Sequence, residues 1–196
     1  MMSLITLLKK HSKDLKEDSK LVKYLGNLEH EAKDGKYHLA LVSEKLALSR
    51  AKELGLDIGI KIEDLVFKAR KNYIPKIYKQ LDKLIRNLNL SSKFYFNDVR
   101  ILELQVSKLF RHANSTGQLK KYFKQISKES DKYKDKAIEE NKNNIKLSRK
   151  YYWISKVYSL VIDVFKDIGI NRTYSNNRYK KLKKGIKAFS SDTHKM

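Results

Sequence analysis

The sequence predicts an all-α protein: an irregular helical bundle of about six to eight helices, with long C-terminal helices and a basic C-terminal extension. Three observations support this prediction. The 196 residues include only one proline and seven glycines, and a β-sandwich would need more frequent turns. Apolar residues recur at three- and four-residue spacing along most of the chain. The chain is 41% hydrophobic, which is enough for a core and too much for a disordered chain.

The N-terminal part is predicted to form an amphipathic helical segment followed by a helical hairpin. Residues 3–25 have apolar side chains at helical spacing, and Gly26 is expected to interrupt the helix there. The hairpin covers residues 27–54 and turns at Gly35. Gly55 then stands where a left-handed glycine usually ends a helix.

The middle of the chain is predicted to hold two helices separated by a proline. Residues 56–60 form a linker in which Gly59 acts as a helix stop, and a helix covers 62–73. Pro75 is expected to begin the next helix, to about Leu88, because proline fits the first turn of a helix.

A further helix is expected to be capped at residues 97–98 and to end near Ala113. Residues 118–168 contain neither proline nor glycine. This stretch forms either one very long helix or two helices, broken near Ser130 or at 141–144. Its polar part could be a solvent-spanning helix or the seam of a homodimer, and the sequence leaves both open.

The most apolar segment of the chain lies at 151–168. Its face is formed by Ile154, Val157, Val161, Val164 and Ile168, widened by Trp153, Leu160 and Phe165. So wide an apolar face predicts a central core helix, with Trp153 in the core. These elements make one main domain over residues 1–170, followed by a basic extension over 171–196.

The charge is strongly positive and unevenly distributed. The net charge is +22 at pH 7, with +7 on residues 1–98 and +15 on residues 99–196. A high lysine content is typical of an AT-rich coding sequence, but that bias does not account for the scarcity of acidic residues. We therefore expect a polyanionic partner.

The helix after Pro75 carries a predicted basic stripe. Lys76, Lys79, Lys83 and Arg86 recur every three or four residues and lie opposite an apolar stripe. Asp82 is the one acidic residue between 65 and 96. The predicted nucleic-acid-binding residues of this region are Lys68, Arg70, Lys71, Lys76, Lys79, Lys83 and Arg86. The alternative is an ordinary solvated helix face.

The C-terminal extension has a second basic pattern. On a helix, its apolar residues would form a narrow stripe with lysines on the other side. Such a segment binds nucleic acid, an anionic membrane surface or a partner groove. Its predicted binding residues are Arg178, Lys180, Lys181, Lys183, Lys184 and Lys187. Tyr151 and Tyr152, next to basic residues, are candidates for stacking on bases, although rings at helical spacing are more often core residues.

No motif predicts catalysis, a metal site or a cofactor. The chain has no cysteine, which excludes thiolate chemistry and fits a reducing compartment. The one cluster of metal-ligand types, at residues 29–38, lacks the spacing that places two histidines on one helix face. Phosphate-binding and nucleophile motifs are absent from the sequence.

The sequence therefore predicts a non-catalytic nucleic-acid-binding protein, for DNA or RNA, with phosphate contacts and little sequence specificity. Lysine in place of arginine fits this, because bidentate reading of guanine favours arginine. The alternative is a helical interaction or effector protein whose basic face targets an acidic protein or an anionic membrane surface. The first ten residues do not resemble a signal peptide and no stretch is long enough to span a membrane, so we expect a cytoplasmic protein.

Overall fold

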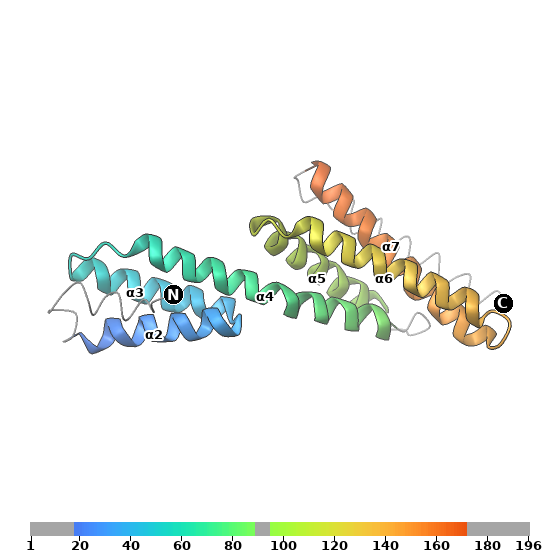
Figure 1. Cartoon of the computed structure of the whole chain (residues 1–196), viewed down its shortest axis with the longest axis horizontal. Helices are drawn as coiled ribbons and strands as arrows, with labels where there is room; N and C mark the ends of the chain where they lie inside the picture. Colours follow the sequence, from blue (N-terminus) through green and yellow to red (C-terminus); the bar gives the residue numbers. More distant parts are fainter. Residues whose placement is uncertain (1–17, 89–94, 172–196) are drawn as a thin grey trace. The chain divides into compact units, whose positions relative to one another are not determined.

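The protein is all-α, as predicted. The structure, a computed structural model, describes residues 18–88 and 95–171. These residues form six α-helices and no strand (Figure 1). The helices are α2 (Ser19–Asp34), α3 (Tyr37–Glu53), α4 (Gly59–Asn87), α5 (Tyr95–Ser115), α6 (Leu119–Glu140) and α7 (Ile145–Asn171). No helix in this part of the chain combines the length and the apolarity of a membrane span.

The chain divides into two compact units between Lys76 and Ile77. The first unit contains α2, α3 and the part of α4 that ends at Lys76. The second contains the rest of α4 together with α5, α6 and α7. A compact unit need not fold by itself, so the predicted main domain over 1–170 stays a prediction. The predicted extension over 171–196 lies almost entirely outside the described residues.

The predicted hairpin turn between α2 and α3 is confirmed. Gly35 has a φ of 62°, and the main-chain N–H of Lys36 donates to the carbonyl of Glu31 at 2.9 Å, closing the end of α2 as expected for a left-handed glycine. A Cβ atom on Gly35 would lie 2.6 Å from the carbonyl oxygen of Asn72. The turn therefore requires glycine for its conformation and also for the close approach of α4.

The predicted break at Gly26 is wrong, because α2 runs through this residue. Leu21, Leu25 and Leu28 are fully buried on one side of α2. A glycine in a helix costs only about 1 kcal/mol relative to alanine. The burial of leucines on both sides of Gly26, at about 1.5–3 kcal/mol each, outweighs that cost.

The middle of the chain was predicted with the wrong helix boundaries. Gly59 begins α4 instead of stopping a helix, and Pro75 lies inside α4. An interior proline removes the hydrogen bond to the carbonyl four residues earlier and costs about 3 kcal/mol. Ile74 and Ile77, on either side of it, are fully buried. Their burial favours a continuous helix over the break that Pro75 alone would predict.

Two long helices, α6 and α7, form an antiparallel hairpin that dominates the second unit. The 118–168 stretch is thus two helices, separated at residues 141–144, and Asn144 caps α7 by accepting from the main-chain N–H of Leu147 at 3.1 Å. The hydroxyl of Ser148 donates to the carbonyl of Ala137 at 2.6 Å. The apolar face predicted for α7 is buried at Ile154, Val157, Val161, Val164 and Phe165.

Serine hydroxyls lie in the interface between α6 and α7. The Ser130 hydroxyl is 3.1 Å from the Ser155 carbonyl and 3.0 Å from the Ser159 hydroxyl. The Ser155 hydroxyl donates to the Ser130 carbonyl at 2.9 Å. These small side chains let the two helices approach closely while their buried polar groups remain hydrogen-bonded.

Two local expectations in the second unit need correction. Trp153 is only half-buried, so it is not a core residue. Helix α5 begins at Tyr95, which places Asp98 in its first turn and not at its cap. An acidic side chain in the first turn is favourable in either position, because the N-terminus of a helix carries a partial positive charge.

Candidate nucleic-acid interface

The first four predicted residues of α4 differ in what their side chains do. Lys68 and Lys71 are exposed. Arg70 is half-buried, stands 4.9 Å above the ring of Tyr37 and donates to the Tyr37 hydroxyl. The Lys76 ammonium group donates to the main-chain carbonyl of Asp34. Arg70 and Lys76 therefore hold α4 against the α2–α3 hairpin within the first unit.

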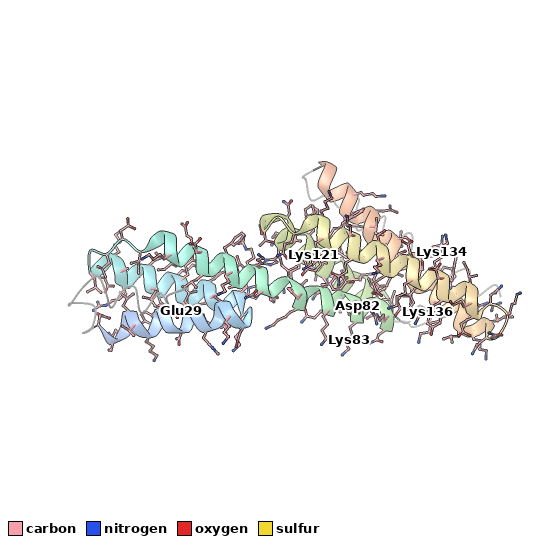
Figure 2. The ribbon with its side chains drawn as sticks, viewed as in Figure 1. Glu29, Asp82, Lys83, Lys121, Lys134 and Lys136 are labelled. Carbon is pink, nitrogen blue, oxygen red and sulfur yellow. The ribbon has the colours of Figure 1, made fainter. Side chains whose placement is uncertain are left out.

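In the second unit, Lys79 and Lys83 are exposed on α4, and Figure 2 shows Lys83 at the edge of this helix. The last predicted residue of α4, Arg86, pairs with carboxylates of the protein itself. Its guanidinium group pairs with Asp82 at 2.8 Å and with Glu129 at 3.5 Å. A cation held between two carboxylates attracts a phosphate much less than a free one.

A polar cluster surrounds Arg86. The Tyr158 hydroxyl donates to Asp82 at 2.5 Å, and Arg86 lies 5.7 Å from the centre of the Tyr133 ring. Burial raises the pKa of Tyr158 far above its ordinary value, and the hydrogen bond to Asp82 raises it further. The hydroxyl therefore keeps its proton and remains a donor. The cluster joins α4, α6 and α7. It gives Arg86 a structural role within the protein that requires no bound ligand.

The two tyrosines predicted to stack on bases lie in different surroundings. Tyr151 is half-buried, with its ring centre 5.8 Å from that of Tyr133. Tyr152 is 44% exposed, and its ring contacts Trp153 edge-on at 5.2 Å. Tyr152 thus has the more accessible ring of the two, and base stacking stays a prediction for both.

The predicted binding residues of the C-terminal extension, from Arg178 to Lys187, lie outside the described residues. The structure consequently describes the predicted binding cations only on α4, and their role in binding stays a prediction. There it leaves four of the seven predicted cations exposed and without a described partner: Lys68, Lys71, Lys79 and Lys83.

A more concentrated basic face lies on α6, and sequence reasoning missed it. It consists of Lys120, Lys121, Lys124 and Lys128, all exposed, and is called the α6 lysine face below. At ~100° per residue these side chains fall within an arc of about 100°. The buried side chains of Tyr122 and Ile126 lie on the opposite side of the helix. The three- and four-residue spacing of these lysines is present in the sequence. The prediction for this stretch used only its apolar residues and so did not include them.

The α6 lysine face changes sign further along the helix. Asp131, Asp135 and Glu139 follow at the same angular positions and are also exposed. Among residues 119–128 there is no acidic side chain. Figure 2 shows the later lysines Lys134 and Lys136 projecting to different sides of α6, so they do not extend the face.

Two lysines of the α6 lysine face, Lys120 and Lys121, lie in the first turn of α6 and oppose the polarity of the helix. The N-terminus of a helix is its positive end, and cations there cost about 0.3–1 kcal/mol each. The first turn of α6 contains no acidic residue and its last turn no basic one. The Gln118 side chain makes no capping hydrogen bond. Cations, a helix start without a side-chain cap and the positive end of the dipole thus coincide at the start of α6, where they would act together on an anion.

No cluster of three or more histidine, aspartate or glutamate side chains able to hold a metal ion is found in residues 18–88 and 95–171. Comparisons with protein-family models, with curated proteins and with solved structures give no match for this chain.

Proposed function

We propose that the protein binds nucleic acid without catalysis, through phosphate contacts of the α6 lysine face. The observation that carries the proposal is four exposed lysines on one side of α6, with no acidic residue among them and an apolar core behind them. Their Cα atoms span about 12 Å along the helix axis, comparable to the axial extent of about four successive phosphates of one strand. Lys79 and Lys83 on α4 supply further positive charge within the same unit.

The kind of charge and its placement also support the proposal that binding has low sequence specificity. Lysine is a flexible point charge, and contacts to phosphate carry no direct sequence information. The acidic second half of α6 would repel a strand that continued along the helix. A bound strand is therefore expected to cross α6 near its N-terminus and not to follow the whole helix.

A salt titration of a charge-reversal variant tests the proposal. The variant carries Lys120→Glu, Lys121→Glu, Lys124→Glu and Lys128→Glu. Binding of labelled duplex DNA, single-stranded DNA and RNA is followed by fluorescence anisotropy. For the wild type and duplex DNA, we expect a log–log salt slope of about −3.6 or steeper, since each phosphate contact contributes about −0.9. The variant should lose most of this slope and bind at least about tenfold more weakly.

The control reverses four other exposed lysines of the same unit: Lys134→Glu, Lys142→Glu, Lys146→Glu and Lys150→Glu. Both variants have the same net charge, and circular dichroism checks that both remain helical. If both weaken binding equally, net charge accounts for it and the α6 lysine face is not the site. Binding to phosphatidylserine vesicles in the absence of nucleic-acid binding would contradict the proposal altogether.

A further inference from the structure

After its first residue, helix α3 buries only small side chains, and several of its large apolar side chains are exposed. Its buried residues are Tyr37, Ala40, Ser43, Ala47 and Ala51. In contrast, Leu39, Val42 and Leu46 are 54%, 56% and 43% exposed. A helix that packs on one core normally shows the reverse arrangement, and a helix that is apolar on several sides is normally buried. No side chain of the described residues buries this second apolar face.

Leu39, Val42 and Leu46 form a continuous row, called the α3 stripe below. Their spacing of three and four residues places them within about 60° of one another on the helix. The row is about 10 Å long. Anchors at such positions are the pattern by which one amphipathic helix packs on another.

The surface next to the α3 stripe is positively charged. Lys45 and Lys52 are exposed, seven residues apart on one side of the stripe, and neither pairs with a carboxylate of the described residues. Of the two acidic residues of α3, Glu44 is half-buried on the opposite side of the helix from the stripe, and Glu53 is bound by Arg50 at 2.5 Å. Nε of the same Arg50 donates to Asp18 at 2.8 Å. The unpaired charge beside the apolar row is therefore positive.

We propose that the α3 stripe is the docking site for an acidic amphipathic helix of a partner protein. The apolar side of that helix would cover Leu39, Val42 and Leu46, and its flanking carboxylates would face Lys45 and Lys52. A second copy of this chain fits less well, because two stripes brought together would place the same lysines near each other. This inference concerns the first unit and is independent of the nucleic-acid interface on α6.

Two synthetic helical peptides test the proposal on the full chain. Both are stapled, fluorescently labelled and about 16 residues long, with identical leucine rows at i, i+3 and i+7. One has glutamates beside the leucines and the other has lysines. The acidic peptide should bind at least about tenfold more tightly, since two exposed ion pairs are replaced by two repulsions.

Two variants locate the binding. Leu39→Ala, Val42→Ala and Leu46→Ala together should weaken binding of the acidic peptide at least about tenfold, because the apolar contact area is lost. The matched control replaces three exposed apolar residues elsewhere, Ile101, Leu104 and Ile138, by alanine and should bind like the wild type. The variant Lys45→Glu with Lys52→Glu should reverse the preference and select the basic peptide.

Four outcomes would overturn the proposal. The first is that neither peptide binds, or that both bind equally. The second is that the Lys45→Glu, Lys52→Glu variant leaves the preference unchanged. The third is a doubled mass in light scattering that returns to a single chain in the stripe variant, which assigns the stripe to a second copy. The fourth is a melting temperature of the stripe variant far below that of the control, which means that the chain covers its own stripe.

Discussion

Helices α3 and α6 begin in the same way and present opposite surfaces. Each starts two residues after a glycine with positive φ, 62° at Gly35 and 68° at Gly117. α3 buries alanines and exposes leucines, whereas α6 buries Tyr122 and Ile126 and exposes lysines. Two helices with the same start thus offer surfaces suited to different partners, one apolar and one ionic. In this molecule the surface of a helix is set by which side chains pack inward, and not by how the helix begins.

The largest expected difference within a pair of variants is the one between the two glycines. Gly35→Ala should reduce the free energy of unfolding by about 3 kcal/mol, because a left-handed alanine is strained by about 1 kcal/mol and its Cβ would overlap the main chain of Asn72. Gly117→Ala should lose only about 1 kcal/mol, since no atom lies within 4 Å of its added Cβ. Urea denaturation followed by circular dichroism measures both. Equal losses would show that the main chain of α4 shifts to accommodate the Cβ added at Gly35.

A second pair of variants tests the opposite size preferences of the buried faces. Ala47 and Ile126 are 0% and 1% exposed. Ala47→Leu should lose about 2 kcal/mol through overpacking, and Ile126→Ala about 3 kcal/mol through the cavity it leaves. The exposed Leu46 and Lys121 serve as controls, and their alanine variants should change stability by less than about 0.5 kcal/mol. If Ala47→Leu were harmless, α3 would not be closely packed on its inner side.

The smallest expected effect concerns the end of α3. The hydrogen bond from Arg50, helped by the N–H of Leu21, lowers the pKa of Asp18. Because its pKa is lower in the folded protein than in the unfolded chain, this carboxylate stabilises the fold above about pH 4, and the stabilisation is lost as the pH falls further. The melting temperature of the wild type should therefore drop more steeply between about pH 4 and pH 2 than that of Asp18→Asn. Parallel curves would contradict this role. Asp34, whose pKa is also lowered, chiefly by Lys36, remains in both proteins.

The sequence predicted the helical class and the turns that depend on local chemistry. Gly35 and Gly55 were assigned correctly, because a left-handed glycine after a helix is a local signal. Gly26 and Pro75 were misread, since the burial of residues on both sides of them favours a continuous helix. Gly59 was also misread, because it begins α4 where a helix stop was predicted.

The candidate site was less predictable, because contacts between distant residues decide which cations are available. Arg70, Lys76 and Arg86 bind Tyr37, Asp34 and Asp82 respectively, and only the last of these partners is near in sequence. The α6 lysine face differs, since its spacing alone would have revealed it. The outward leucines of α3 could not be told from core residues, because their periodicity is the same in both cases.

The serine contacts between α6 and α7 have a practical consequence for labelling this protein. Sliding one helix past the other by one turn, about 5.4 Å, would break the hydrogen bonds that the hydroxyls of Ser130 and Ser155 make between the two helices. Their hydrogen bonds define the pairing of the two helices far from the connecting residues 141–144, which are exposed. We therefore expect that the connection before Asn144, which caps α7, can be lengthened to carry a fluorophore tag, or cut to create new chain termini, while the hairpin keeps its alignment.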